Sequence, residues 1–579
     1  MKPFGPNPRS SWRTFLGSFL GSSSDVTMVG PKAGFLSRPL TNPVNTRDTV
    51  VHMDATAAEP AAAEGAAQET PAPWVRLYSR HLMNMAILVM LPMVAAATLN
   101  RSRTLFVDPD IWWHLANARI LVTAHHFIHT DPYSFTVVGQ PWINWEWLSE
   151  LAYWFSYQAL GLRGIYVVTW FALAANILFV YWRGYWLGRS ADAALWSSAI
   201  AFVLMTVNSG PRMIEFAYLA MSAELAILEA ADRGNKRWLW LLPPLFCLWI
   251  NLHGMWFAGL VLLGIYIACG MVPVSLGIFE QRAFTPSERN RLLGIFGACV
   301  VALFVNPYGW HLMWNPLDMM MNQKLSVSTI AEWQPLNLSN MEGKGVVVAI
   351  AVMVIANCIR GRKWKIYEMI FVFLAWYAAV AHVRFCYFAA VLTAPMLARD
   401  LARSFSSESD TKTIPVMNGL LAAGALGVML YMFPTEAALQ KMVEMMFPVH
   451  EIAAIQPSWR TLDYDYVGGR MAFQSRPSFI DSRFDSFEHL GIMKDYRSIM
   501  MSYNSIELMD KYRVDHALLK DDLPITYLIE KSPDWQVLMR EKAWQGEYIL
   551  FVRTGHSSAI SPACAPPPPL PQHEAPSVK

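Results

Sequence analysis

The chain has 579 residues, of which 54% are hydrophobic and only 16% are charged, against roughly 25% charged residues in an ordinary soluble protein. So few charges do not cover the surface of a water-soluble fold of this size, which argues against a cytosolic enzyme. The net charge of +2 excludes a protein built mainly to hold nucleic acid. The composition therefore predicts a protein embedded in the lipid bilayer.

The two ends of the chain lack the apolar runs of its middle. Residues 1–80 contain no apolar run long enough to span a bilayer, and residues 55–73 are rich in Ala, Glu and Pro. Residues 556–579 include the proline run Pro566–Pro569. We expect both ends to be disordered, the first as a cytoplasmic arm.

Residues 81–434 are dominated by uncharged runs close to the roughly 20 residues that a helix needs to cross a bilayer. The stretch Trp238–Phe279 contains no Asp, Glu, Lys or Arg and predicts two helices broken near Asn251–Gly254. Residues 366–398 likewise predict two helices, folded at His382–Arg384. The other predicted spans, which bring the total to eleven, are 82–99, 164–182, 193–211, 213–230, 292–310, 346–359 and 414–434.

The distribution of basic residues predicts the orientation of these helices. With the N-terminus inside, the five cytoplasmic connections hold 15 Lys or Arg in 50 residues, whereas the four short outer connections hold 4 in 39. This orientation leaves two large regions outside, namely the first loop, 100–163, and a C-terminal part, 435–555.

The C-terminal part predicts a small α/β domain. A helical stretch at Ser505–Tyr512 lies among short apolar runs that are typical of strands. The strand-like runs are Ser478–Asp481, Val514–Leu519, Trp535–Met539 and Tyr548–Val552.

The first outer loop carries the strongest candidate chemistry. Asp108 and Asp110 flank Pro109 and precede a stretch that predicts a helix on the membrane surface. One of the two is expected to cap that helix, while a carboxylate at this level is suited to deprotonate an acceptor hydroxyl or to hold a divalent cation. The tryptophans expected to form an interfacial belt are Trp112, Trp113, Trp142, Trp145 and Trp147.

Three features of this loop occur in the same order in a known family. They are the acidic pair Asp108 and Asp110, the Ala118-Arg119 pair of the expected surface helix, and Gly139-Gln140-Pro141 before the next apolar segment. The loop resembles the first periplasmic loop of GT-C glycosyltransferases, in particular the branch of aminoarabinose transferases and protein O-mannosyltransferases. The resemblance implies an all-α polytopic, GT-C-like membrane domain over 81–434 and a C-terminal domain in the periplasm.

The resemblance also implies an activity. GT-C enzymes move a sugar from a polyprenyl-phosphate carrier to a glycan, lipid or protein acceptor on the outer face of the membrane, here the bacterial inner membrane. Their catalytic carboxylate comes from the first loop, which maps to Asp110 or Asp108. We expect Asp110 to be the base, because Asp108 precedes a proline and is held extended. His114, at i+4 from Asp110, either orients that carboxylate or lies at the interface without a role.

Further candidates lie where the predicted topology places polar groups at the outer ends of spans. Arg212 and Arg384 are candidate phosphate ligands, because a guanidinium fork suits phosphate; the alternative is contact with lipid head groups. His253 breaks an apolar run and is a candidate ligand for phosphate, metal or acceptor, or else is hydrogen-bonded within the helix bundle. Glu332 is either part of the same site or a solvated loop carboxylate. For Arg119, contact with lipid head groups is favoured.

One pair of acidic residues and two clusters of mixed composition complete the candidates. Glu146 and Glu150 either add to a site for a possible divalent cation or lie on a solvated helix face. The clusters Asp463–Tyr466 and Asp481–Arg483 combine acids with aromatic or basic side chains, as sugar-binding surfaces and ordinary turns both do. No other cofactor is indicated by the sequence.

Two other functions remain open. A transporter or flippase for a lipid-linked glycan would use Arg384, His253 and Glu224 as its pathway, and a repeat-unit polymerase or ligase would take a lipid-linked oligosaccharide. The odd number of predicted spans, the lack of an inverted repeat and the large outer regions favour a glycosyltransferase. The sequence has no P-loop, which argues against a nucleotide-driven pump.

Overall fold

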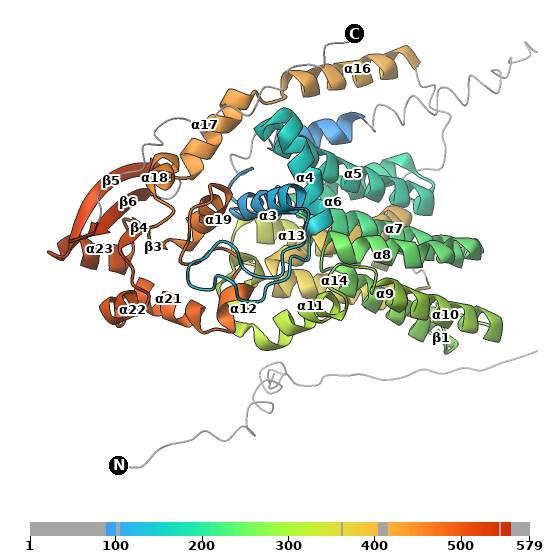
Figure 1. Cartoon of the computed structure of the whole chain (residues 1–579). Coiled ribbons are helices and arrows are strands. Elements are labelled where there is room, and N and C mark those ends of the chain that lie inside the picture. The colour runs from blue at the N-terminus through green and yellow to red at the C-terminus, as the bar shows by residue number, and fades with distance from the viewer. Residues whose placement is uncertain (1–88, 100–104, 361–362, 403–414, 544–545, 557–579) are drawn as a thin grey trace, which may run out of the picture. The chain divides into compact units, whose positions relative to one another are not determined.

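The computed structural model describes residues 89–99, 105–360, 363–402, 415–543 and 546–556. All of them belong to one compact unit, Pro71–Lys579. The unit is mostly helical, with a small sheet near the C-terminal end (Figure 1). The predicted arm 1–80 lies outside the described residues, as does the predicted tail 556–579 apart from His556.

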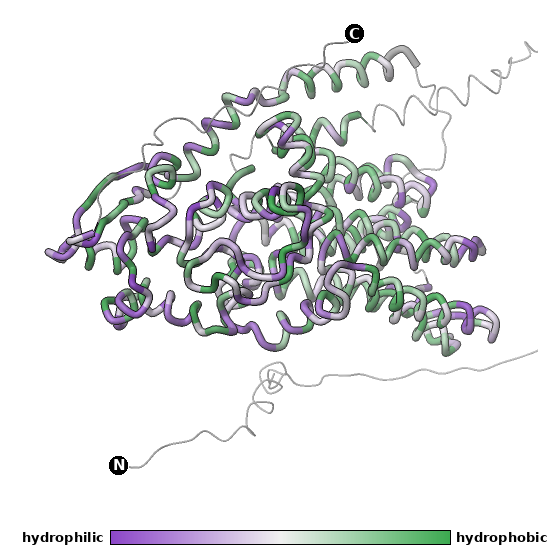
Figure 2. Tube along the Cα trace, in the orientation of Figure 1, coloured by the Kyte–Doolittle hydropathy of each residue, from purple (hydrophilic) through white to green (hydrophobic). Residues whose placement is uncertain are grey.

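Each apolar run that predicted a helix contains one. The tube of α10 is hydrophilic at one end and mainly hydrophobic along the rest of its length (Figure 2). Helix α10 shows how such an end is fixed, because Thr285 and Glu288 form a reciprocal capping box and Pro286 occupies its first turn. The apolar helices are Val89–Leu99, α5 (Leu162–Gly188), α6 (Ala191–Thr206), α7 (Ile214–Asp232), α8 (Leu242–Leu252), α9 (Trp256–Cys269), α10 (Pro286–Ala302), α13 (Met341–Arg360), α14 (Ile366–Ala381), α15 (Cys386–Leu401) and α16 (Pro415–Tyr431).

Both predicted helix breaks are confirmed. Between α8 and α9, His253 has an extended backbone (φ −171°, ψ 151°). The side-chain amide of Asn251 holds the end of α8, since it donates to the carbonyls of Cys247 at 2.8 Å and Val305 at 2.9 Å. Between α14 and α15 the chain turns through an extended His382 and a 3₁₀ turn, η3 (Val383–Phe385).

The number of membrane crossings stays a prediction. Among the described residues, α5 alone is long and apolar enough to cross a bilayer by itself. A bent pair, Gly419–Tyr431 with Glu436–Met446 at 55°, has the required length and apolarity when taken together. Five further apolar helices have 10–17 residues, and a helix of this length covers about 15 to 26 Å at 1.5 Å per residue. The helices are therefore as predicted, whereas the eleven spans are an interpretation of them.

The first outer loop forms two helices, α3 (Asp110–Ala124) and α4 (Trp147–Leu160). The helix α3 is covered by other parts of the protein, because its residues from Ile111 to Ala118 are buried, and its place along the membrane surface stays a prediction. Trp112 is fully buried and Trp113 is 6% exposed, since α4 packs on one side of α3 and α19 (Asp465–Phe473) on another. The predicted interfacial belt is wrong for these two residues and for Trp142, which is 5% exposed.

Three connections hold elements that the sequence did not predict. The second helix of the run ending at Phe279 stops at Cys269, and a hairpin of β1 (Val274–Leu276) and β2 (Phe279–Gln281) follows it. Gly277, with φ 55°, allows the tight turn of that hairpin. The other new elements are η1 (Lys236–Leu241), α11 (Trp310–Asn322), α12 (Lys324–Thr329) and η2 (Ala331–Trp333).

The C-terminal part contains a four-stranded sheet in the order β3-β4-β6-β5. The edge strand β3 pairs with β4 in parallel, whereas β4, β6 and β5 pair antiparallel. Strands are confirmed at three of the predicted runs, but Ser478–Asp481 forms only an isolated bridge between Ser478 and Ser134. The elements are α17 (Glu436–Met446), α18 (Val449–Ala454), β3 (Thr461–Asp463), α20 (Asp485–Glu488), α21 (Ile492–Met500), α22 (Ser505–Lys511), β4 (His516–Lys520), α23 (Pro524–Lys531), β5 (Trp535–Ala543) and β6 (Gly546–Arg553).

The apolar core is continuous between the helices and the C-terminal part. Phe447, Tyr548 and Leu550 belong to the same buried cluster as Trp112 of α3. A contact at the start of α5 adds to this packing, because the carboxylate of Glu436 accepts the backbone N–H groups of Leu162 at 2.8 Å and Arg163 at 3.1 Å. The C-terminal part is thus packed directly against the segment that carries the candidate carboxylates.

Candidate active site

Asp108 and Asp110 lie at the N-terminal end of α3, and only Asp108 takes part in capping the helix. Pro109 occupies the position before the helix, and the carboxylate of Asp108 accepts the backbone N–H of Asp110 at 3.0 Å. Asp108 therefore satisfies one of the free donors of the first helical turn. The side chain of Asp110 takes no part in capping and retains some exposed surface.

Arg212 lies between two carboxylates that are distant in the sequence. It follows α6, and its guanidinium forms ion pairs with Asp108 of the first loop and with Glu332 of η2. It also donates to the side-chain carbonyl of Asn208 at 2.8 Å. This arginine neutralises two carboxylates and ties the first outer loop to the second.

Arg384 presents a different situation at the η3 turn. Its guanidinium stacks over the ring of Trp333, 4.4 Å from the centroid, and interacts electrostatically with Asp110 and Glu146. Among the described residues it forms no ion pair and no side-chain hydrogen bond, and its Nε atom is buried without a partner. Arg384 is thus a half-buried cation whose hydrogen-bonding capacity is unused.

Glu146 sits between two histidines. One oxygen lies 3.3 Å from His114 Nε2, and the other lies 3.0 Å from His253 Nε2. The backbone N–H of Met255 donates to His253 Nδ1 at 3.0 Å, so the proton of neutral His253 is on Nε2 and points at Glu146. His253 is therefore anchored at the break between α8 and α9.

Glu150 is the buried member of this hydrogen-bond network. One of its oxygens accepts from His114 Nδ1 at 2.8 Å and from Asn117 at 2.9 Å, and the other accepts from Asn144 at 2.6 Å. Tyr133 in turn donates to Asn117 at 2.7 Å. Since Glu150 is fully buried and both its oxygens are bonded, it orients the residues around it and is closed to substrate.

The surroundings of Asp110 change its acidity. Burial among these groups, followed by the negative charge of Asp108, raises the pKa of Asp110 to about 7. The polar side chain of Ser482 and the positive charges of His114 and Arg212 act in the opposite direction. A carboxyl group with this pKa is half ionised near neutral pH, which suits a general base.

The neighbouring acid and histidine are shifted towards their charged forms. Burial alone would lower the pKa of His114, but the hydrogen bond to Glu150 and the charges of Glu146, Glu150 and Asp110 outweigh it and raise that pKa. Burial would likewise raise the pKa of Glu146, but His253 and His114 hold it below its ordinary value. His114 and Glu146 thus form a charged pair beside Asp110.

The structure brings all eight predicted site residues into this network. Six of the eight retain exposed surface, whereas His114 and Glu146 are buried, as are Glu150, Asn117 and Asn144. The eight are Asp108, Asp110, His114, Glu146, Arg212, His253, Glu332 and Arg384.

Several individual expectations are corrected. Glu146 and Glu150 do not lie on a solvated helix face, because they are 7% and 0% exposed. His114 does not orient Asp110 by a hydrogen bond, since both its nitrogens face glutamates. The guanidinium of Arg119 is not directed towards lipid head groups, because it donates to the carbonyl of Phe473 in α19 at 2.9 Å.

The sequence reasoning missed Asn117, Asn144, Trp333 and Ser482. Asn117 had a local signal, because it lies seven residues after Asp110 and three after His114 and so shares their helix face. The other three come from separate segments, and no local pattern links them to Asp110. Their roles follow only from the packing.

The carboxylates as arranged do not fit a divalent cation. The gap between Asp108 and Glu332 is spanned by Arg212, and the oxygens of Glu146 and Glu150 face His and Asn donors. Within the described ranges, no group of three or more His, Cys, Asp or Glu side chains is arranged to hold a metal ion. The positive charge of this site comes from arginine and histidine.

Two cavities lie away from this network, at helix ends for which the sequence predicts a cytoplasmic location. One has a volume of about 200 Å³ and is lined by Asp232, Tyr367 and Arg399, among others. The other has a volume of about 310 Å³ and is lined by Lys236 and Glu288, among others. Neither is lined by any of the eight candidate residues.

No protein-family model matches the sequence, and no curated protein matches it. Among solved structures the chain is similar to the oligosaccharyltransferase of Archaeoglobus fulgidus. The apo form superposes with a TM-score of 0.47 at 13% identity over 76% of this chain and 69% of that chain. The form tethered with an acceptor peptide gives 0.48 at 13% identity over 77% and 70%, and AglB in complex with an inhibitory peptide and a dolichol-phosphate gives 0.47 at 12% over 77% and 70%. These likenesses are too distant to assign the chain to a family.

Proposed function

We propose that the chain is a GT-C-type glycosyltransferase of the bacterial inner membrane. It moves a sugar from a polyprenyl-phosphate carrier to a hydroxyl group of a cell-envelope glycan, lipid or protein on the outer face. The proposal rests on the resemblance of the first loop to that superfamily and on one arrangement. A carboxylate suited to act as a base, Asp110, lies in the same partly exposed network as an unpaired guanidinium, Arg384.

This pair matches the two needs of the reaction. The acceptor hydroxyl loses its proton to Asp110 as its oxygen bonds to the anomeric carbon of the sugar. The bond between that carbon and the phosphate oxygen breaks, and the electron pair leaves with the polyprenyl phosphate. Arg384 binds the phosphate through its free N–H groups, while Trp333 holds the guanidinium plane in place.

The remaining residues hold these two in position. Arg212 binds the carboxylates of Asp108 and Glu332, which keeps Asp108 from accepting the acceptor proton in place of Asp110. His253 and His114 fix Glu146, and Glu146 in turn interacts electrostatically with Arg384. No step requires a metal ion.

A flippase is the main alternative and would need its polar groups along a path through the bundle. Glu224, the acidic member of that path, is fully buried, and neither of its oxygens has a hydrogen-bond partner among the described residues. A Cβ atom at Gly259 would lie 2.6 Å from an oxygen of Glu224 and still closer to the ring of Trp249, so this carboxyl group lies beside the backbone and an aromatic ring of neighbouring helices and not in a polar pathway. The polar groups gather instead at the outer helix ends, which favours catalysis there.

The test is glycan transfer by the purified full-length protein with a panel of polyprenyl-phosphate sugars. General-base catalysis is typically worth 10²–10⁴-fold, so Asp110→Asn is expected to lower turnover by about that factor. Asp108→Asn is expected to have a smaller effect, because Asp108 is already paired. Glu507→Gln, which changes an exposed glutamate of α22, is the matched control.

The readouts are released polyprenyl phosphate and glycosylated acceptor. Near-normal turnover of the Asp110→Asn variant would show that Asp110 is not the general base. Movement of an intact lipid-linked glycan across proteoliposomes without its cleavage would instead establish the flippase. Turnover with lipid-linked oligosaccharide but with no monosaccharide donor would favour a polymerase or ligase.

A further inference from the structure

We propose that the larger of the two cavities, with a volume of about 310 Å³, binds the phosphate-bearing head group of an anionic membrane lipid. The cavity lies at the hydrophilic end of α10, away from the candidate active site (Figure 2). Pockets for small ligands commonly measure about 300–1,000 Å³, so this one is large enough for a head group but not for a whole lipid. The inference concerns binding alone and does not depend on the transferase chemistry.

Three connections between helices build the polar part of the cavity. They are 231–237, 280–291 and 360–365, here called the first, second and third connections, and the basic residues of the sequence predict a cytoplasmic location for all three. Because the connections are far apart in the chain, packing alone brings them together. The charged residues of the lining are Asp232, Lys236, Arg282, Glu288, Arg291 and Lys365.

Ion pairs hold the three connections together around the cavity. Lys365 pairs with Asp232 at 2.6 Å, which joins the third connection to the first. Lys236 pairs with Glu288, which joins the first connection to the second. The polar wall is therefore a cross-linked frame and not a set of independent loops.

The two acids of the lining are already saturated with donors. Asp232 accepts hydrogen bonds from two tyrosine hydroxyl groups and from Lys365. Glu288 accepts from Lys236, from Arg282 at 3.0 Å and from a backbone N–H group at the start of its own helix. Neither carboxylate is left to attract a cation into the cavity.

The basic residues of the lining, in contrast, keep unused capacity. Four cations line the cavity against the two acids, which leaves an excess of two positive charges. Arg291 has neither an ion pair nor a side-chain hydrogen bond within the described part of the chain. Arg282 binds Glu288 through one terminal nitrogen alone, and its side chain is 69% exposed. A guanidinium group with free N–H groups suits a phosphate oxygen, so the cavity is built for an anion.

The neighbouring apolar side chains favour a lipid over a free phosphate. Trp238 and Trp240 of η1 are 44% and 60% exposed, and Leu276 and Ile278 of the β1–β2 hairpin are 72% and 57% exposed. Both elements also contribute residues to the cavity. Basic pockets between membrane helices bind acidic head groups, and tryptophans are typical of the level where head groups meet acyl chains. A lipid would occupy both features, since its phosphate enters the cavity while its chains lie along the apolar side chains.

The test is binding of phosphatidylglycerol to the purified full-length protein in detergent, followed by native mass spectrometry. We expect phosphatidylglycerol to bind about tenfold more tightly than the zwitterionic phosphatidylcholine, because the cavity carries excess positive charge. Arg291→Gln is expected to weaken binding of phosphatidylglycerol about fivefold, the typical effect of one basic side chain at an anionic lipid surface. The double variant Arg282→Gln/Arg291→Gln is expected to weaken it by more than about tenfold.

Arg289→Gln is the matched control, because it removes the same charge from an exposed position of α10 that does not line the cavity. It is expected to leave binding unchanged. Equal weakening by Arg289→Gln and Arg291→Gln would reduce the effect to general surface charge and overturn the inference, as would unchanged binding by the double variant. Equal binding of the two lipids would also overturn it. Displacement of the lipid by glycerol 3-phosphate at equal concentration would show a site for free phosphate and overturn the lipid assignment.

Discussion

At the scale of single residues, the site is decided by which charged groups are paired and which are not. Arg212 and Arg384 were equivalent candidates in the sequence, but the structure separates them. Arg212 is bound to Asp108 and Glu332, whereas the guanidinium of Arg384 stacks on the ring of Trp333 and has no ion pair within the described part of the chain. The unpaired arginine is the one available to a phosphate group.

Replacing Arg384 by lysine tests that distinction. The positive charge remains, but the planar fork and the stacking on Trp333 are lost. We expect the KM for the lipid donor to rise about tenfold, while the KM for the acceptor stays unchanged, because only the phosphate contact is weakened. Initial rates at varied donor concentration measure this, with Arg497→Lys at an exposed position as the control.

The acidity of Asp110 predicts the pH dependence of the reaction. With a pKa of about 7, the carboxyl group is protonated at lower pH and unable to accept a proton. Since the base form accumulates as pH rises through this value, kcat/KM is expected to climb towards a plateau above about pH 8. A profile measured from about pH 5 to about pH 9 checks this. A profile that is flat over this range, as expected for an ordinary carboxylate that titrates near pH 4, would contradict it.

At the scale of elements, the helix α3 was expected on the membrane surface and is found inside the protein. The pattern of the sequence was ambiguous, because tryptophans are typical both of membrane interfaces and of cores. The deciding contacts come from α19, where Arg470 stacks on Trp112 at 3.9 Å and Phe473 lies 5.4 Å from the same ring. These partners lie more than 350 residues along the chain from α3, beyond the reach of any local pattern.

The close approach of α19 to α3 gives a prediction at this scale. Gly469→Val would push α19 away from Pro109, because its Cβ has no room there. Overpacking of this kind typically costs about 1–3 kcal/mol of stability. We expect a lower thermal unfolding midpoint, followed by tryptophan fluorescence, together with loss of transfer. Gly297→Val, at a position in α10 where a Cβ meets no atom within 4 Å, is the control.

At the scale of the whole molecule, the orientation across the membrane links the site to its substrate. A polyprenyl-phosphate donor and an envelope acceptor meet only if Asp110 and the C-terminal part face the periplasm. The asymmetry of 15 against 4 basic residues in the connections predicts that they do. The two structured regions that enclose Asp110 would then lie on one side of the membrane.

A topology reporter tests this orientation. A reporter that is active only in the periplasm, fused after Arg553, is expected to be active, because β6 ends there. The same reporter fused in the connection between α9 and α10 is expected to be silent. Activity of a cytoplasmic reporter after Arg553 would reverse the orientation and place the site on the wrong face for the proposed reaction.

The sequence by itself determined the apolar helices and the breaks at His253 and at His382–Arg384, and it named the acids and bases that the candidate site brings together. These features are local, because apolar runs and helix-breaking residues act within a few turns of the chain. The runs at Val514–Leu519 and Tyr548–Val552 became strands for the same reason.

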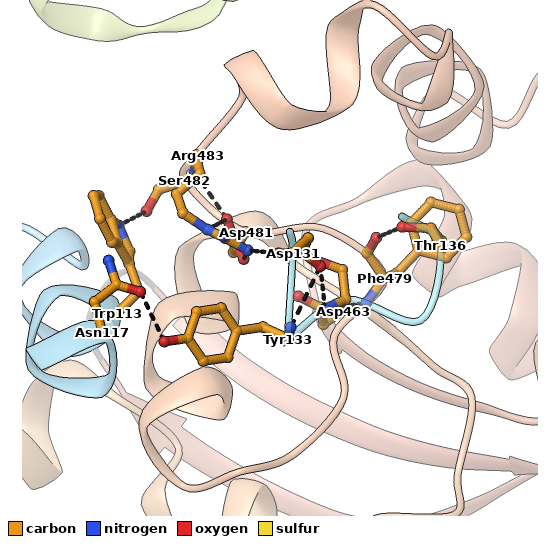
Figure 3. Close-up of polar contacts among 11 residues, drawn as sticks. Trp113, Asn117, Asp131, Tyr133, Thr136, Asp463, Phe479, Asp481, Ser482 and Arg483 are labelled. Atoms are coloured by element: carbon orange, nitrogen blue, oxygen red, sulfur yellow. Dashed lines mark hydrogen bonds and ion pairs between the residues drawn. The ribbon is translucent and has the colours of Figure 1, made fainter. Parts of the chain in front are cut away.

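Only the tertiary structure decided how those residues are used. Asp108 precedes α3 and Arg212 lies between α6 and α7, and Ser482 lies 369 positions from its partner Trp113. The run Ser478–Asp481 resembled a strand but pairs with the first loop, where Ser478 exchanges backbone hydrogen bonds with Tyr133 and Phe135. The carboxylate of Asp463 takes up the backbone N–H of Phe479 (Figure 3). An ion pair or a hydrogen bond forms where packing brings two groups together, and that packing is set by the whole chain rather than by the local spacing of its residues.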